Sequence, residues 1–79
     1  MIEDDWSIGA ARSLLGASLL ALHRYSDAET QLVQARHELE AMPTVPAPAV
    51  RDTVRRLAAL YAAWGKPHDA AAYRALLQY

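Results

Sequence analysis

One layout, two helical patterns joined by a short turn, occurs twice in the chain, and this repetition is the strongest constraint on its fold. Residues 13–35, SLLGASLLALHRYSDAETQLVQA, hold an apolar helical pattern, a few turn residues and a second pattern led by alanine. Residues 56–77, RLAALYAAWGKPHDAAAYRALL, show the same order of features. An offset of 42 residues aligns Leu57 with Leu15, Tyr61 with Leu19, Ala70 with Ala28 and Leu77 with Ala35. The chain is therefore predicted to hold two copies of one helical hairpin.

Four stretches space apolar or small side chains at three- and four-residue steps, the pattern of one packed face of an α-helix. They predict helices at about residues 5–22, 26–42, 48–64 and 67–78. The predicted packed faces are Ile8, Ala11, Leu15, Leu19 and Leu22; Ala28, Leu32, Ala35, Leu39 and Met42; Val50, Val54, Leu57, Tyr61 and Trp64; and Ala70, Tyr73 and Leu77. No stretch alternates with a period of two, so we expect an all-α fold.

Polar side chains mark where the first two helices are expected to begin. Asp4 or Asp5 can cap the first helix. Residues 26–29 read Ser-Asp-Ala-Glu and fit a capping box, in which the Ser26 hydroxyl and the Glu29 carboxylate bind backbone N–H groups that the helix leaves unpaired. Only residues 23–25 separate the two helices, so they must fold back on each other as a hairpin.

Prolines and a glycine mark the remaining boundaries. Residues 43–48, PTVPAP, cannot lie inside a helix and form the predicted linker between repeats at about 8–42 and 49–79. Gly65 can adopt the left-handed conformation that ends the third helix, and Pro67 suits the first turn of the fourth. All 79 residues are thus expected to form a single domain.

The duplicated hairpin resembles the tetratricopeptide repeat (TPR), whose signature of about 34 residues places Leu-Gly, an aromatic and small residues at set positions. The matching positions are Leu15, Gly16, Tyr25, Ala28 and Leu32 in the first copy and Leu57, Tyr61, Gly65, Ala70 and Tyr73 in the second. The sequence departs from the signature at Arg12, Val54 and Ala58. The resemblance implies a short right-handed solenoid of two TPR-like hairpins, in which Gly16 and Ala28 let paired helices approach closely and Tyr25 packs beneath the turn.

The resemblance also implies a function, because TPR domains bind proteins or peptides in a groove lined mainly by the first helix of each repeat. The groove residues it implies here are Ser13, Ala17, Leu20, Ala21, Asp52, Arg55, Ala59 and Ala62. The clamp that some TPR domains use for a chaperone's C-terminal carboxylate needs Lys and Asn where Ser13 and Ala17 stand, so no such clamp is expected. Residues 60–77 are similar to the terminal repeat of larger bacterial TPR proteins, including TPR tails of bacterial serine/threonine kinases. A regulatory tail of a larger enzyme is therefore an alternative to an independent scaffold module.

Two repeats leave apolar surface bare at the end of the array, since a helical repeat cannot cover its own apolar face. Exposed apolar surface of this kind commonly marks an interface, so we predict a homodimer formed through the last hairpin. The predicted contact residues are Ala72, Tyr73, Leu76, Leu77 and Tyr79. Trp6 and Trp64 are further contact candidates, although Trp64 suits the core equally well. A closed four-helix bundle that holds a ligand in its interior would use similar stripes and is a third interpretation.

Composition argues against two classes of partner. Eight Lys and Arg against nine Asp and Glu give a net charge of -1, which lacks the basic surplus of a nucleic-acid-binding protein. No stretch approaches the roughly 18 consecutive apolar residues typical of a membrane span, so no membrane partner is expected. The chain has no cysteine, which rules out disulfides and thiolate metal sites and fits a cytoplasmic location.

Side chains that could act in catalysis or bind a metal are few and scattered. His23, His37 and His68 do not form the i, i+4 pair of a helical zinc site. Glu38 and Glu40 point about 200° apart on a helix and are poor partners for acid–base chemistry. The serines lack a nucleophile elbow, and the three glycines form no phosphate-binding loop. No enzymatic activity, metal or cofactor is therefore expected.

Arg51, Arg55 and Arg56 form the densest basic patch. Arginine can hold a phosphate or an acidic peptide through paired N–H donors. We interpret the patch instead as an ordinary solvated helix face, because Asp52 is interleaved with the arginines.

Overall fold

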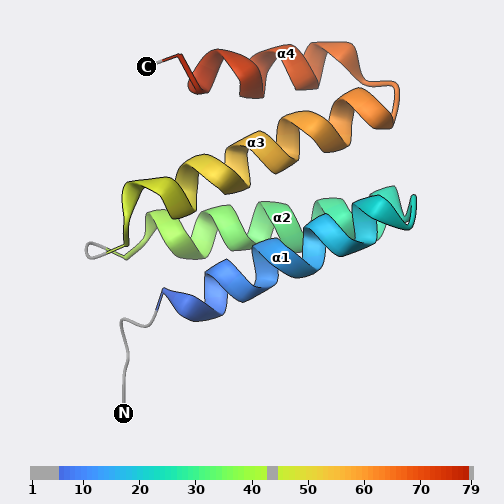
Figure 1. Cartoon of the computed structure of the whole chain (residues 1–79). Helices are drawn as coiled ribbons and strands as arrows, with labels where there is room; N and C mark the ends of the chain where they lie inside the picture. The colour runs from blue at the N-terminus through green and yellow to red at the C-terminus, as the bar shows by residue number, and fades with distance from the viewer. Residues whose placement is uncertain (1–5, 43–44, 79) are drawn as a thin grey trace.

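The computed structural model describes residues 6–42 and 45–78, which form four α-helices and no strand. The helices are α1 (Ser7–Ala21), α2 (Tyr25–Glu40), α3 (Ala47–Ala63) and α4 (Pro67–Leu76), and they form two helical hairpins in the order α1–α2 and α3–α4 (Figure 1). The all-α prediction is confirmed, and the described helix ends lie within two residues of the predicted ones. The expected start at residue 5, with its caps Asp4 and Asp5, lies outside the described residues.

The four helices are arranged as an open stack. The outer helices α1 and α4 lie at opposite ends, with α2 and α3 between them (Figure 1). Among the described residues, no Cα atom of α4 comes within 8 Å of one in α1 or α2, so its backbone packs on α3 alone. In a closed four-helix bundle each helix borders two others. The arrangement is therefore not the closed bundle that was the third interpretation.

The core follows the predicted stripes of α2 and α3. Ala28, Leu32, Ala35 and Leu39 of α2 are fully buried, as are Leu57 and Leu60 of α3, while Val54, Tyr61 and Ala70 are nearly so. The apolar positions of α2 recur every three or four residues, so this helix turns one continuous face inward. Leu60 and Thr53 lie in the buried face of α3 although the predicted stripe omitted them.

Helix α1 packs through its smallest residues. Its buried positions are Gly9, Ser13 and Gly16. A Cβ atom at Gly16 would lie 2.5 Å from Leu32 Cγ, and one at Gly9 would lie 2.9 Å from Leu39 Cγ. The predicted role of Gly16 as a point of close helix approach is therefore confirmed, and Gly9 has the same role on the preceding stretch of the helix.

The predicted packed face of α1 is wrong except at Leu19, which is half-buried against the core. Ile8, Leu15 and Leu22 are 59%, 48% and 68% exposed. These three positions follow one another at seven-residue intervals, and the helix periodicity puts them about 100° around the helix from Gly9 and Gly16, outside the face that packs on α2. Because α2 approaches along the glycines, the large side chains point away from the core.

The predicted capping box at the start of α2 is also wrong. The helix begins at Tyr25, so Ser26 lies inside its first turn, and no side chain caps this helix end. Glu29 accepts a hydrogen bond of 2.8 Å from the Tyr61 hydroxyl of α3 instead. The turn before α2 is made by His23, which has a φ of 61°.

The ends of α3 and the start of α4 lie close to the proline and glycine residues that predicted them. Gly65 has the predicted left-handed conformation, with a φ of 77°, and Pro67 is the first residue of α4. Pro46 is extended and α3 begins at Ala47, so the last two residues of the predicted linker belong to the first turn of this helix. Residues 43 and 44 of that linker lie outside the described part of the chain.

Alanine substitutions at the two α1 glycines test how tightly the first hairpin is packed. Gly16→Ala should lower the free energy of unfolding by about 1–2 kcal/mol, because the new methyl group overlaps the buried Leu32 and overpacking outweighs the gain in helix propensity. Gly9→Ala is the matched control, since it has the same propensity gain and meets Leu39 at a longer distance, so it should cost less. Urea denaturation followed by circular dichroism measures both. A Gly16→Ala protein at least as stable as the Gly9→Ala protein would contradict the packing.

Candidate functional site

The residues predicted to line a TPR-type groove differ widely in exposure. Ser13 is 1% exposed and lies at the junction of α1 and α3, so its place in an open groove is wrong. Ala17, Leu20 and Asp52 are half-buried, whereas the other predicted groove residues, Ala21, Arg55, Ala59 and Ala62, are exposed.

Ser13 belongs to a buried polar junction that joins the two hairpins. Its Oγ lies 2.9 Å from Thr53 Oγ1 and accepts a hydrogen bond of 2.7 Å from an Arg56 guanidinium nitrogen. The Thr53 hydroxyl also lies 3.0 Å from the Ala49 carbonyl oxygen. Burial of hydroxyl groups is costly unless they are paired, so this junction fixes how α3 sits on α1. Nothing in the apolar periodicity pointed to it.

A small cleft lies beside this junction, between α1 and the start of α3. It has a volume of about 300 Å³ and an apolar rim, with Asp52 and Arg56 at its polar side. Of the predicted groove residues, it gathers Ser13 and Asp52. The full lining is Trp6, Ala10, Ser13, Leu14, Pro46, Pro48, Ala49, Asp52 and Arg56.

Removal of the Ser13 hydroxyl tests whether this residue supports the fold. Ser13→Ala should lower the free energy of unfolding by about 1 kcal/mol, because Arg56 and Thr53 lose a shared partner. Ser18→Ala on the same helix is the matched control. Its exposed hydroxyl bonds only the Leu14 carbonyl of its own helix, at 3.2 Å, so the effect should stay within about 0.5 kcal/mol. Equal effects in chemical denaturation would contradict a structural role for Ser13.

A second hollow, which we call the α2–α4 groove, holds most of the residues predicted to self-associate. Leu76 and Leu77 line its wider section, of about 460 Å³, and Val50 and Val54 of α3 line it between α2 and α4. The adjoining section, of about 390 Å³, is lined by Arg36, Asp69, Ala72, Tyr73 and Leu76. The structure therefore brings four of the five predicted residues to one groove, and Tyr79 lies outside the described residues.

The three arginines of the basic patch engage three different partners. An Arg51 guanidinium nitrogen donates to the Leu77 carbonyl oxygen at 2.9 Å, and Arg55 pairs with Asp52 at 2.9 Å. Arg56 reaches the Ser13 junction instead. The pair between Arg55 and Asp52 agrees with the interpretation of an ordinary solvated helix face, whereas the half-buried Arg56 joins the two hairpins and does not.

Stacked aromatic rings form a ladder across the turn side of the stack, which the sequence did not predict. Tyr25 stacks on Trp64 with ring centroids 5.9 Å apart, Trp64 on Tyr61 at 6.4 Å, and Tyr61 on Tyr73 at 5.5 Å. His23 extends the ladder at one end, and the Arg36 guanidinium lies 5.4 Å from the Tyr73 ring at the other. Tyr25 thus packs at the turn, as expected, and the ladder ties the turns to α3 and α4.

Tyr61 is the one side chain of this ladder that combines burial with a charged partner. Burial, reinforced by the hydrogen bond to Glu29 and the negative charge of that carboxylate, raises the pKa of the Tyr61 hydroxyl well above its usual value. Its neutral form is therefore favoured in the folded protein, while the unfolded chain loses the proton near pH 10. The stability that this shift contributes is fully present below about pH 10 and is lost as the pH rises further.

The Tyr61 hydrogen bond is tested by Tyr61→Phe. We expect a loss of about 1–2 kcal/mol at neutral pH, because the variant leaves the half-buried Glu29 carboxylate without this donor. The difference in stability between wild type and variant should shrink above about pH 10. Tyr25→Phe, which changes a half-buried ring of the same ladder, controls for general effects of alkaline pH. A difference that stays constant from pH 7 to about pH 11 would contradict the shifted pKa.

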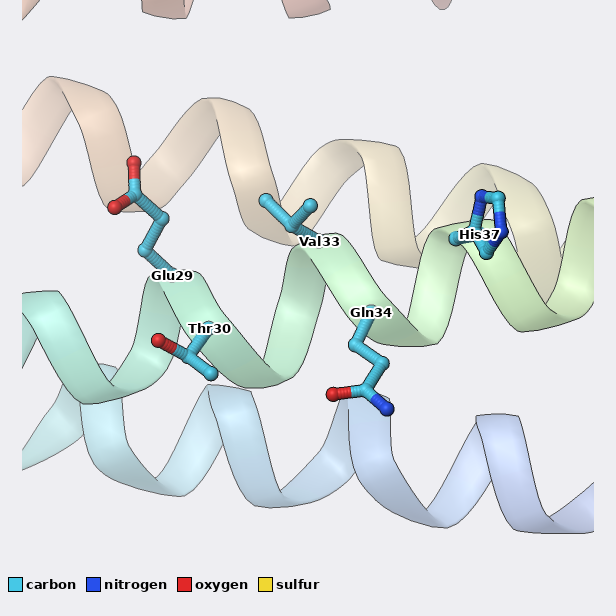
Figure 2. A pocket seen from close by; sticks show the side chains of 5 residues that line it. All are labelled: Glu29, Thr30, Val33, Gln34 and His37. Carbon is cyan, nitrogen blue, oxygen red and sulfur yellow. The ribbon is translucent and has the colours of Figure 1, made fainter.

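The outer face of α2 carries a further shallow hollow. Its five lining side chains, Glu29, Thr30, Val33, Gln34 and His37, all come from α2 (Figure 2). Figure 2 shows Glu29 on one side of the helix and Thr30 and Gln34 directed toward the other. A surface made by one helix does not enclose a small molecule, so this hollow is a helix face and not a ligand cavity.

The described residues contain no cluster of three or more His, Cys, Asp or Glu side chains that could hold a metal ion. The three histidines lie apart, in the α1–α2 turn, in α2 and in α4. None of the described helices is both long and apolar enough to cross a membrane.

Comparisons with protein-family models, with curated proteins and with solved structures find no match for this chain.

Proposed function

We propose that this chain is a non-catalytic protein-interaction or assembly module of TPR type, which binds a protein or peptide partner in the cytoplasm. The proposal rests on one observation: both ends of the helix stack leave surface that no other described helix covers. In the described part of the chain, helix α4 packs its backbone on α3 alone, and the outer side of α1 leaves large apolar side chains in solvent. Exposed apolar surface of this kind is typical of proteins that bind other proteins.

Local features of the two hairpins support the TPR assignment in this proposal. Gly16 contacts Leu32, and Ala28 and Ala70 are buried at equivalent positions of the two hairpins. Gly65 ends α3 in the left-handed conformation, as expected of the turn within the second repeat. The open order of the helices agrees with repeats that contact their neighbours only, the arrangement of solenoid proteins.

The α2–α4 groove is the place where we expect a protein or peptide partner to bind. It offers apolar side chains at Val50, Val54 and Leu76, with Arg36 and Glu40 at its edge. An apolar centre with a charged rim is the usual composition of a protein-binding site.

Capture from a lysate of the source organism tests the proposed function. The immobilised wild-type chain should retain a protein in a fixed ratio, as quantified by mass spectrometry. Leu76→Glu should reduce that capture by about tenfold, because it replaces an apolar side chain of the groove by a charged one that the partner would have to desolvate. Ala75→Glu is the matched control, since this exposed residue is its neighbour on α4 but does not line the groove, and it should retain the partner. Failure of the wild type to capture a protein, or equal capture by both variants, would contradict the proposal.

A further inference from the structure

The outer side of α1 carries an exposed apolar stripe, which we define as Ile8, Ala11, Leu15, Ser18 and Leu22. These residues follow each other at steps of three, four, three and four, the spacing of the a and d positions of a coiled coil. Five of the seven large hydrophobic side chains that are exposed in the described residues lie between positions 6 and 22, and α4 has one. Three of these seven described side chains, Ile8, Leu15 and Leu22, belong to the stripe, whereas α2 and α4 have one each and α3 has none.

The second hairpin shows what kind of structure covers such a stripe. Positions 42 residues later are Val50, Thr53, Leu57, Leu60 and Trp64, of which Thr53, Leu57 and Leu60 are fully buried. In α3 this face packs against helices of the first hairpin, as the bond between Thr53 and Ser13 illustrates. Within residues 6–42 and 45–78, no helix covers the same face of α1. Its natural occupant is therefore another helix.

The order of large and small residues makes the stripe complementary to a second copy of itself. Ile8, Leu15 and Leu22 are large and recur every seven residues, and the positions between them, Ala11 and Ser18, are small. If two copies of α1 run antiparallel about a two-fold axis, each large residue faces a small one. Leu15 then lies opposite Ala11 or Ser18 of the second copy, depending on register. A parallel pair would stack large on large and leave gaps at the small positions.

The charges of the helix permit this approach. Arg12 is the only charged residue between positions 7 and 22, and its Nε donates to Glu38 Oε1 of α2 at 2.9 Å. That ion pair lies on the side of α1 that packs against α2. Arg12 flanks the stripe beside Ala11 and approaches its counterpart when Leu15 lies opposite Ala11, but in each copy Glu38 neutralises its charge, and the net charge of -1 adds little repulsion.

We propose that the chain forms a two-fold homodimer through antiparallel contact between the outer faces of α1, with the C-terminal hairpin free. This rests on the proposed function, because it names one partner of the interaction module. A 15-residue helix is about 22 Å long, so its face buries a few hundred Å² per copy, less than the roughly 800 Å² per partner of a standard interface. The dimer is therefore weak and forms reversibly as concentration rises.

Sedimentation equilibrium of the full chain tests the dimer, over a range from about 10 µM to about 1 mM suited to a weak interface. We expect the mass to rise from 8.7 kDa to twice that value and no further. Leu15→Glu and Leu22→Glu should each raise the dissociation constant by about tenfold or more, because each puts an unpaired charge in the stripe. Both positions are about half exposed or more, so the variants should fold, as thermal melts followed by circular dichroism will show.

Leu76→Glu is the matched control, since it changes an exposed leucine of α4 and should leave the dissociation constant unchanged. Loss of the dimer in Leu76→Glu alone would overturn the proposal in favour of the C-terminal hairpin. Growth beyond the dimer would overturn it in favour of head-to-tail contact between α1 and that hairpin, since only a non-closing interface extends. A monomer at every concentration would overturn it as well. None of these outcomes removes the proposed function, which is measured by capture of a different protein.

Cross-linking tests the direction of the pair. The chain has no cysteine, so Leu14→Cys and Ala21→Cys each introduce a single thiol on the same flank of the stripe, seven residues apart. In the antiparallel pair, Leu14 lies nearer the two-fold axis than Ala21 in either register. A short bismaleimide should therefore link the Leu14→Cys protein several times more efficiently. Equal yields would overturn the antiparallel arrangement.

Discussion

The contact between Gly16 of α1 and Leu32 of α2 is the constraint on which the first hairpin depends. No Cβ separates the α1 backbone from the Leu32 side chain, so α2 approaches α1 along its small residues. The rotation of α1 about its axis is set by this approach. Ser13, one turn before Gly16, then meets α3, and Ile8, Leu15 and Leu22 turn outward. The apolar exterior of the molecule is thus a direct result of how its interior is packed.

The sequence predicted the helices and the faces of α2 and α3, but it predicted the face of α1 wrongly. In α2 the alanines and leucines share one face and leave polar residues on the other, so periodicity identifies the buried side. In α1 only Arg12 is charged, and apolar or small residues surround the helix. Periodicity then offers two candidate faces. Packing selects the one with Gly9 and Gly16, because close backbone approach needs small residues, while a count of large side chains favours the other face.

The polar contacts between the hairpins could not be predicted from the sequence for a different reason. Glu29 fits a capping motif with Ser26, yet α2 starts two residues earlier than the motif requires, and the carboxylate binds Tyr61 instead. Ser13, Thr53 and Arg56 meet across about 40 residues of chain, a relation that local patterns do not encode. The same limit applies to the α2–α4 groove. Its apolar residues were identified one by one, but their assembly with Arg36 depends on where α4 lies over α3.

The single-sided attachment of α4 determines the order in which the molecule can open. This helix has ten residues, fewer than the roughly 12–15 that an isolated helix needs in water, so it is helical only while it is docked on α3. Its core contacts are Ala70 and Tyr73, together with the bond from Arg51 to the Leu77 carbonyl. Helices α1 and α2 hold each other through Gly16, Leu32 and the buried face around them. Amide hydrogens of α4 will therefore exchange with solvent through local detachment while the first hairpin stays intact, which makes the C-terminal segment a separate cooperative unit of the fold.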